Sequence, residues 1–311
     1  MLSNSHLSGP RMCGHLATRR LHHRPASRHG FTIIELLVAI VIIAILIGLL
    51  IPAVLKARRT AQEATVRVEI SNLSTAIGAF KATYGIEPPS RITLYNTQAG
   101  WDGDPTSKNI IHSIWPTFDF TQNDLGITGP TTLYPPECLV FFLGGIPTSV
   151  TAPAVPSPTG FSKNASRPFL SGGTGSRSGP FFEFNQGRLI RTPIAANSST
   201  NLIVYVDAIS GNSGTAKPYA YFSTYDGSGY QATADLSGSG LTFDIYKTSA
   251  GGPAWNPLSH QIITAGFDGD YGAGSSAGGF YDPSSTTANF GLTATGDYDN
   301  ITNIAPGRLK P

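Results

Sequence analysis

The feature that most constrains this chain is an apolar run near its N-terminus, residues 31–51, with the sequence "FTIIELLVAIVIIAILIGLLI". Every residue in it except Thr32 and Glu35 is apolar or glycine. At the helical rise of about 1.5 Å per residue, a run of this length spans about 30 Å, which matches the hydrocarbon core of a bilayer. The run therefore predicts a membrane-spanning helix that carries one carboxylate near its start.

Basic residues flank this run on both sides. Residues 1–30 hold five arginines and no acidic residue, and Lys56, Arg58 and Arg59 follow the run. The positive-inside bias favours a cytoplasmic N-terminus and an exported remainder. A cleaved secretory signal is the alternative, but its apolar core would span only about 7–15 residues before an Ala-x-Ala-like site. The segment "IPAVLKARR" offers no such site, so we expect a single-pass inner-membrane protein with a periplasmic body.

The composition of the remainder argues against a nucleic-acid partner. Subtracting the five arginines of residues 1–30 from 21 Lys and Arg leaves 16, against 19 Asp and Glu, so the remainder is acidic by three charges. The formal charge of +2 thus comes from a short basic head rather than from a folded basic face. Of the two cysteines, Cys13 lies in the head, and Cys138 in "ECLVFFLGG" is expected to be a buried small hydrophobe.

The helix is predicted to continue beyond the membrane. Apolar residues recur there at steps of four and three, which indicates one apolar stripe on a helix; they are Val66, Ile70, Leu73, Ile77, Phe80 and Tyr84. Gly85, followed by Pro88 and Pro89, is a helix stop signal. The pattern predicts one helix over 31–84, kinked at Pro52 because proline lacks an N–H and clashes with the preceding turn.

The stripe is expected to pack on a β-sheet. Four short runs rich in β-branched and aromatic residues predict an antiparallel meander; they are "NLIVYVD" (201–207), "PYAYFST" (218–224), "LTFDIYK" (241–247) and "HQIITAG" (260–266). Residues 144–180, rich in Pro, Ser, Thr and Gly, resist assignment, and so does 272–296, a Gly/Ser/Thr loop of a kind that is either functional or mobile. The expected fold class is α+β: a long N-terminal helix on an antiparallel sheet, with long Gly/Ser/Pro-rich loops.

The residues around the apolar run resemble a known signal. In "GFTIIELLVAIVIIAILIGLLIP", Gly30, Phe31, Glu35 and Pro52 fall in register with the class III signal of type IV pilins and of type II secretion pseudopilins. The resemblance implies that a prepilin peptidase cuts between Gly30 and Phe31 and methylates the new amine. It divides the chain into a leader (1–30), a transmembrane helix (31–51), an amphipathic helix packed on the body (52–84) and a periplasmic body (85–311).

The leader is long for such a signal. Both methionines of the chain, Met1 and Met12, lie in it. Initiation at Met12 would leave 19 residues before the cleavage point (12 to 30). The start of translation therefore stays open between the two.

Glu35 acquires a role from this resemblance. A charge at membrane depth is costly, about 2.5–3.5 kcal/mol at a helix centre on insertion scales. Cleavage creates a cationic amine on Phe31, and Glu35 of a neighbouring subunit could pair with it and fix the register of assembly. The alternative is local, because Thr32 and Glu35 have capping-box spacing. Glu35 can also serve both uses in sequence, as a local cap and as the partner of the Phe31 amine.

The C-terminal part resembles pseudopilin G. "YVDAISGNSGTAKPYAYFS" is similar to an Asp-initiated turn before a Pro-Tyr-x-Tyr strand, and "IITAGFDGDYG" with "GDYDNITN" looks like the family's C-terminal loop. That loop holds a structural Ca²⁺, which implies Asp268, Asp297 and Asp299 as ligands, with the Thr264 carbonyl a weaker candidate. Residues 272–296 interrupt the motif. Two spare acids could substitute as ligands: Asp270, just before this insertion, and Asp282, within it. The alternative is that these Asp-Gly pairs are ordinary turns.

Three function classes are compatible with these features. The leading one is a structural pseudopilin of a type II secretion-like pseudopilus, and the alternative is a type IV pilin or minor pilin for adhesion or DNA uptake. The expected partners are copies of itself, other pseudopilins, prepilin peptidase and an inner-membrane assembly platform. An enzyme is not expected: the G-x-S-x-G match at 274–278 lies in low-complexity sequence, and outside the leader only His112 and His260 are possible bases.

Overall fold

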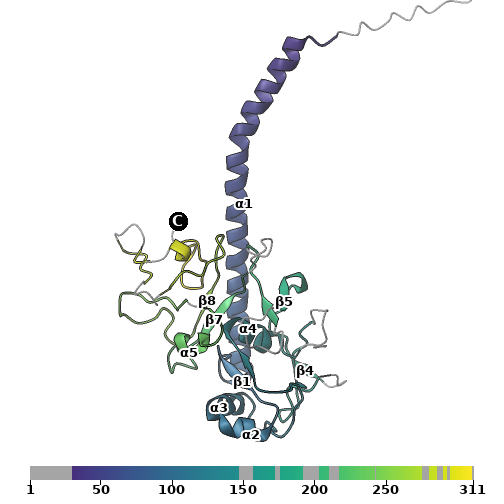
Figure 1. Cartoon of the computed structure of the whole chain (residues 1–311), viewed down its shortest axis with the longest axis vertical. Helices are drawn as coiled ribbons and strands as arrows, with labels where there is room; N and C mark the ends of the chain where they lie inside the picture. The colour runs from purple at the N-terminus through teal and green to yellow at the C-terminus, as the bar shows by residue number, and fades with distance from the viewer. Residues whose placement is uncertain are drawn as a thin grey trace, which may run out of the picture. The chain divides into compact units, whose positions relative to one another are not determined.

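The computed structural model describes residues 30–146, 157–171, 176–191, 203–209, 217–241, 243–274, 280–285, 290–292 and 295–309. The leader residues 1–29, including Met12 and Cys13, lie outside this set. By its internal contacts the chain divides into two units, residues 1–54 and 55–311. Helix α1 (Ile33–Tyr84) belongs to both, and every other described helix and strand belongs to the second (Figure 1).

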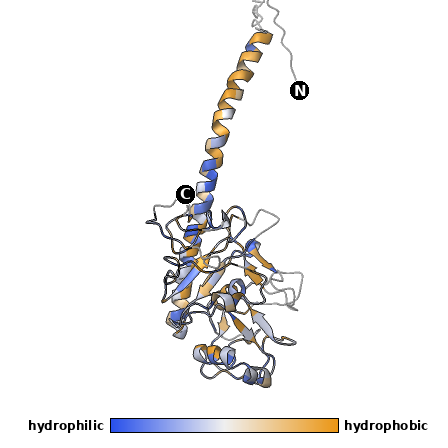
Figure 2. Cartoon of the chain, turned by 60° about the vertical axis from the view of Figure 1, so that its left-hand side comes forward, coloured by the Kyte–Doolittle hydropathy of each residue, from blue (hydrophilic) through white to orange (hydrophobic). Residues whose placement is uncertain are grey.

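The first half of α1 exposes its apolar side chains. From Phe31 to Leu55 every residue is exposed, and Ile34 and Leu49 keep 70% and 73% of their surface accessible. Among the described residues, α1 is long and apolar enough to cross a membrane, and Figure 2 shows the hydrophobic stretch followed by a hydrophilic one. The helix is continuous through Pro52, so proline interrupts its hydrogen bonding without ending it.

The second half of α1 confirms the predicted stripe. Its buried residues recur at helical spacing; they are Glu63, Val66, Ile70, Leu73, Ala76, Ile77 and Phe80. The helix ends as predicted, because the N–H of Gly85 donates to the carbonyl of Lys81 at 2.8 Å and Gly85 has φ of +86°. A side chain at Gly85 would be strained in this left-handed conformation.

A helical segment follows α1, in a region for which the sequence made no prediction. Its elements are β1 (Ile92–Leu94), α2 (Gln98–Gly103), α3 (Pro105–Ile114), β2 (Thr131–Leu133) and α4 (Pro135–Gly144). Strands β1 and β2 pair antiparallel. Caps explain where the helices begin: Thr97 accepts from Gly100 N–H at 3.2 Å, and Asp104 accepts from Ser107 N–H at 3.1 Å. Helix α4 is almost wholly buried and belongs to the main core.

Shorter elements complete the chain. They are β3 (Phe161–Ser162), β4 (Arg177–Ser178), β5 (Leu189–Arg191), β6 (Ile203–Tyr205), β7 (Ala220–Ser223), α5 (Ala232–Leu236) and β8 (His260–Ile263), with 3₁₀ turns η1 at Gln186–Arg188 and η3 at Thr295–Asp297. Strand β3 pairs with β4, β5 with β6, and β7 with β8, all antiparallel. A bridge between Val206 and Pro218 links β6 to β7, and one between Ile263 and Thr302 adds the C-terminal segment to β8.

This arrangement confirms the α+β fold class and corrects one strand. The predicted runs 201–207, 218–224 and 260–266 contain β6, β7 and β8. The described part of run 241–247 forms no strand beyond a bridge at Lys247. The Gln261 side chain takes the place of strand pairing there: it accepts from Tyr246 N–H and donates to the Tyr246 carbonyl, both at 2.9 Å. Burial of Phe243 and Tyr246 and backbone hydrogen bonds from Trp255 to Tyr246 and from Tyr281 to Lys247 position this run.

The β7–β8 pair separates two hydrophobic cores. Alternate residues of a strand face opposite sides of a sheet, so Tyr219 and Tyr221 join the core that contains α1 and α4. Ala220 and Phe222 face a second core, whose other members come from 232–309. All four residues of β7 are buried. A second layer therefore covers the face of the sheet that α1 does not contact.

Candidate functional site

The start of α1 is closed by a reciprocal cap between Thr32 and Glu35. The carboxylate oxygen Oε2 of Glu35 accepts from the Thr32 N–H and from the Thr32 hydroxyl, both at 2.8 Å. In return the Glu35 N–H donates to the Thr32 hydroxyl at 3.3 Å. This is the capping box that the spacing allowed. In the single chain, Glu35 is therefore held by the first turn of its own helix.

Gly30 and Phe31 precede the first helical residue. A side-chain Cβ built on Gly30 would meet no atom within 4 Å, and Gly30 does not adopt the left-handed conformation. Phe31 is 83% exposed. Among the described residues, neither crowding nor backbone strain requires glycine at position 30.

Several contacts fasten the second half of α1 to the body, among them an ion pair between Lys81 and Asp226 at 2.9 Å. The contact with the most hydrogen bonds centres on Glu69. Arg188 donates to both carboxylate oxygens of Glu69, with Nη1 to Oε2 at 2.8 Å, and the Tyr205 hydroxyl donates to Oε1 at 2.6 Å. The Tyr219 hydroxyl donates to Oε2. Burial alone would raise the pKa of Glu69, but the hydrogen bonds from Arg188 and the two tyrosines outweigh it and hold the pKa below its usual value.

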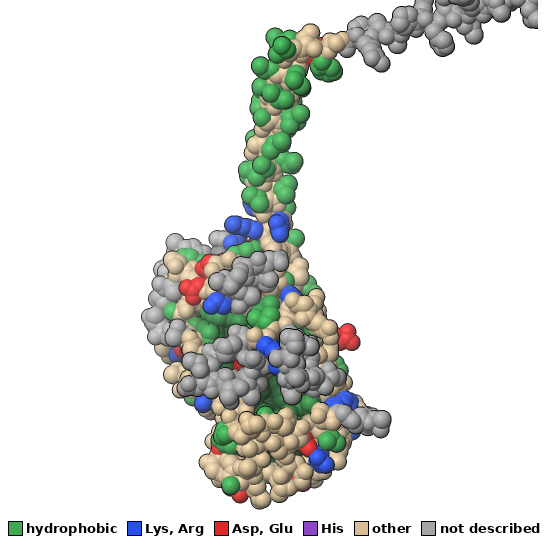
Figure 3. Space-filling view, turned by 45° about the vertical axis from the view of Figure 1, so that its right-hand side comes forward, with side chains coloured by type: hydrophobic (Ala, Val, Ile, Leu, Met, Phe, Trp, Pro, Cys, Tyr) green, Lys and Arg blue, Asp and Glu red, His purple; other side chains and the backbone are tan. Residues whose placement is uncertain are grey.

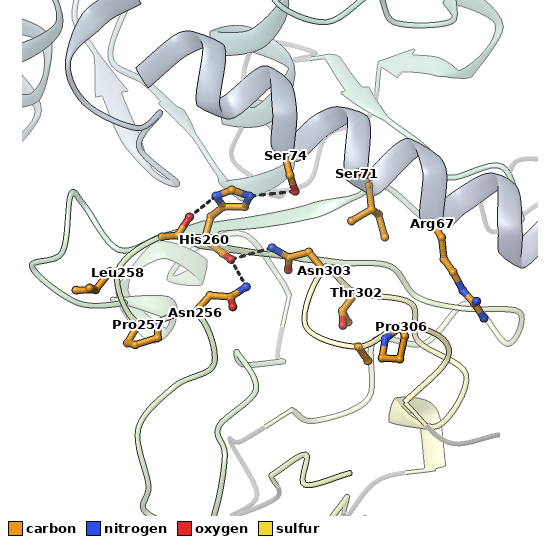
Figure 4. Close-up of a pocket in the computed structure, with 13 residues that line it drawn as sticks. Arg67, Ser71, Ser74, Asn256, Pro257, Leu258, His260, Thr302, Asn303 and Pro306 are labelled. Atoms are coloured by element: carbon orange, nitrogen blue, oxygen red, sulfur yellow. Dashed lines mark hydrogen bonds between the residues drawn. The ribbon is translucent and has the colours of Figure 1, made fainter. Parts of the chain in front are cut away.

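Another contact is a chain of polar side chains through His260 (Figure 4). His260 Nε2 lies 3.2 Å from the Ser74 hydroxyl of α1, and Nδ1 lies 2.9 Å from the Ser259 hydroxyl. Ser259 in turn donates to Glu87 at 3.1 Å. Glu87 is buried, which would raise its pKa, yet its contacts with His260 and Ser259 lower that pKa overall. This series of hydrogen-bonded side chains links β8 to α1.

A groove of about 670 Å³ runs beside Ser74, Ser259 and His260. It is lined by α1 and by the loops at 256–260 and 302–306. The Asn256 and Asn303 side-chain amides on its wall both donate to the backbone carbonyl of His260, at 3.1 and 3.0 Å. These amides are thus engaged in holding the loops together. His112, the other predicted base, is exposed in the last turn of α3, and residues 275–278 of the G-x-S-x-G match lie outside the described residues.

A further contact joins the end of the chain to α1. Arg308 Nε lies 3.0 Å from Glu63 Oε1, and Arg67 Nη2 lies 3.5 Å from Glu63 Oε2. Sequence reasoning missed Glu63, Glu69, Glu87 and Arg188. They look like ordinary surface charges in the sequence, and only the partners that the fold brings to them distinguish them.

The acidic residues near the C-terminus accept hydrogen bonds from N–H and O–H groups. Buried Asp297 accepts from the Tyr246 hydroxyl at 2.8 Å and from Gly274 N–H at 2.9 Å. Asp299 Oδ2 accepts from the N–H groups of Phe267 at 2.6 Å and Asp268 at 3.1 Å. Such contacts stabilise turns. Gly272, with φ of +67°, allows the approach of Asp297, because a Cβ there would lie 2.4 Å from its Oδ1.

As arranged, these acids do not form a set of calcium ligands. Within the residues that the structure describes, no three His, Cys, Asp or Glu side chains gather in a group suited to a metal ion. Burial and mutual repulsion raise the pKa of Asp268. The two spare acids also serve turns: Asp270 accepts from Gly272 N–H at 3.0 Å, and Asp282 from Ser284 N–H at 2.9 Å. Calcium binding by Asp268, Asp297 and Asp299 therefore stays a prediction.

Comparison with known proteins identifies the N-terminal segment. A family model described as the prokaryotic N-terminal methylation motif matches residues 25–51. No curated protein and no solved structure shows a significant match to the chain. The matched residues include Gly30, Phe31 and Glu35 and the apolar first half of α1, so the sequence resemblance is confirmed for this segment. The chain thus carries a prokaryotic N-terminal methylation motif at residues 25–51.

Proposed function

We propose that this chain is a structural subunit, a pseudopilin of a type II secretion-like pseudopilus. Prepilin peptidase removes residues 1–30 after Gly30 and methylates the amine of Phe31. The mature subunit spans the inner membrane once, with its N-terminus cytoplasmic and its body periplasmic. It then assembles through α1 with copies of itself and with other pseudopilins on an inner-membrane platform. The methylation motif at 25–51, which includes the first half of α1 with its exposed apolar side chains, is the observation that carries this proposal.

Assembly requires Glu35 to change partners. In the single chain its carboxylate is satisfied by Thr32, which lowers the cost of holding a charge at membrane depth until another subunit arrives. Cleavage then supplies a cationic amine at Phe31. Leaving that amine and the carboxylate of a neighbour unpaired in lipid is costly, so their pairing fixes the axial position of each incoming subunit. Glu35 thus caps its own helix before assembly and forms an ion pair with a neighbouring subunit in the filament.

The secretion reading is preferred to the surface-fibre reading because of the C-terminus. Removal of the leader leaves Cys138 as the single cysteine, so a mature subunit cannot close a disulfide within itself. Cys138 is buried and free in α4. The C-terminal segment is instead held by the Arg308–Glu63 ion pair and the bridge between Ile263 and Thr302. A type IV pilin or minor pilin is the second candidate, in which the large body at 85–311 would serve adhesion or DNA uptake.

A catalytic role is not part of this proposal. Both ring nitrogens of His260 contact serine hydroxyls that join α1 to β8. This arrangement fits a structural fastening of the helix. Structural Ca²⁺ in the loop of Asp268, Asp297 and Asp299 is retained from the family resemblance, and it requires these carboxylates to exchange N–H and O–H donors for the ion.

The deciding experiment for assembly compares Glu35→Gln with wild type in cells that contain the peptidase and the assembly platform. Glutamine keeps the shape and still accepts from Thr32, but it cannot form an ion pair with the Phe31 amine. We expect the variant to be inserted and cleaved but to form few filaments. Asp282→Asn, which removes one charge from an exposed turn, is the control. Normal filaments from Glu35→Gln would refute the pairing mechanism, and an uncleaved wild-type chain would refute the processing step.

A further inference from the structure

Three basic residues project from α1 directly after its apolar stretch. Lys56, Arg58 and Arg59, here called the basic collar, are the first charged residues after Glu35, and all three are exposed. Figure 3 shows Lys and Arg side chains grouped on the helix at this point. At about 3.6 residues per turn they point roughly 0°, 200° and 300° around the helix axis. They therefore lie within an arc of about 160° on the helix, directly beyond its apolar stretch.

The charge of the collar is not neutralised within the protein. None of the three forms an ion pair in the part of the chain that the structure describes. The nearest acid along the helix, Glu63, lies between Arg308 and Arg67. The Arg59 guanidinium stands over the ring of Phe267 at 5.8 Å. A stacked guanidinium keeps its N–H edges available for oxyanions such as phosphate.

Leader removal, which rests on the proposed function, reverses the charge asymmetry of the span. Before cleavage, five arginines precede the apolar run and three cations follow it within nine residues. After cleavage, the N-terminal side retains only the Phe31 amine and Glu35, whose charges cancel. The collar then carries all the net charge that flanks the span. The five arginines that flanked the span on its N-terminal side are removed with the leader, whereas the opposite side keeps three cations.

We propose that the basic collar binds the anionic phospholipid headgroups of the leaflet at the C-terminal end of the span, and that after processing it is the main electrostatic tether of the subunit. Anionic headgroups attract basic residues that flank a transmembrane helix, by about fivefold in affinity per residue near the surface. Headgroups suit this position because they lie at the end of the hydrocarbon core, where the first charged residues after the apolar run emerge.

The test measures lipid selectivity on purified mature protein in bilayers, without other pilus components. Spin-labelled phosphatidylglycerol and phosphatidylcholine report how strongly each lipid associates with the protein. We expect wild type to prefer phosphatidylglycerol at least fivefold, since several collar charges contribute. Half-molar salt should reduce the preference, because the Debye length falls to about 4 Å. Lys56→Gln/Arg58→Gln should lose most of it, and adding Arg59→Gln should abolish it.

Lys163→Gln/Lys247→Gln removes the same number of charges from the body and should leave the preference unchanged. Equal lipid association in wild type, an equal loss in this control, or a preference that salt does not weaken would overturn the proposal. So would a response to phosphatidylglycerol placed only in the leaflet at the N-terminal end. The measurement needs no filament, and unprocessed protein can be measured beside the mature form. Failure of assembly or cleavage is therefore distinguishable from failure of the collar.

Discussion

Glu69 and Arg188 lie 119 residues apart in the sequence and form a two-pronged ion pair that joins α1 to the start of β5. Tyr205 and Tyr219 hydroxyls donate to the same carboxylate. This helix also carries the methylation motif. Glu69 therefore connects the segment proposed to assemble with the sheet of the body.

Replacement of Glu69 by alanine should destabilise the body. The variant leaves Arg188 and two tyrosine hydroxyls without their acceptor. Breaking a fully buried pair costs about 3–5 kcal/mol, but both groups are partly exposed, so we expect about 1–3 kcal/mol after allowance for solvent screening. Urea denaturation of the protein in detergent measures this. Exposed Glu183→Ala is the matched control, and an equal effect of the two substitutions would show that the Glu69 contacts carry no special weight.

Gly30 should be needed for processing and dispensable for folding. Its Cβ position is open, and its backbone is not left-handed, so Gly30→Val should not alter the melting temperature. A branched side chain should block the close approach of a peptidase to the backbone. Mass spectrometry of wild type should find a chain that begins at a methylated Phe31, and of the variant an uncut chain. Gly48→Ala, also at an open position, should be cut normally. Full processing of Gly30→Val would contradict the prediction.

Glu137 should make the stability of the body fall as pH rises. Burial at the start of α4 raises the pKa of Glu137 from 4.5 to about 7, although its hydrogen bond from Tyr134 N–H opposes this. Between these values the folded state binds more protons than the unfolded state, so unfolding free energy decreases as pH increases. Glu137→Gln keeps the acceptor and removes the ionisation, and it should be more stable than wild type at pH 8 by about 1–3 kcal/mol.

Denaturation at several pH values measures this slope. Burial also raises the pKa of Asp235, so part of the slope should persist in the Glu137→Gln variant. Glu69 and Glu87, with lowered pKa values, contribute stability that is lost on acidification below about pH 4.5. The two effects occupy different pH ranges. If Glu137→Gln leaves the slope between pH 4.5 and 7 unchanged, ionisation of Glu137 is not its cause.

Calcium removal tests the family-derived metal site. If Asp268, Asp297 and Asp299 hold Ca²⁺, EDTA should lower the melting temperature and protease resistance of the full chain in detergent, and added Ca²⁺ should restore both. The full chain is needed because α1 contributes seven buried residues to the body. Asp299→Asn should abolish the calcium response, while Asp282→Asn should keep it. Indifference of wild type to EDTA would leave these carboxylates as turn-stabilising groups only.

Pattern reasoning succeeded where one segment determines its own structure. The apolar run and the stripe of Val66, Ile70 and Phe80 predicted α1 to within two residues at its start, because helical hydrogen bonds and periodicity are local. Gly85 ended the helix as predicted. Run 241–247 failed because strand-like composition also suits a buried irregular segment. The Gln261 side chain, which satisfies the backbone of Tyr246 there, is an interaction that periodicity cannot show.

By itself, the sequence determined the methylation motif, the apolar stretch with its single acid, the long helix and the α+β class. Each of these depends on residues that are neighbours along the chain or along one helix. Only the tertiary structure decided which charged side chains hold distant segments together. Glu63, Glu69 and Glu87 look alike in sequence, and they differ because folding brings Arg308, Arg188 and Ser259 to them. A charge is stabilised by what lies beside it in space, and chain order does not specify that.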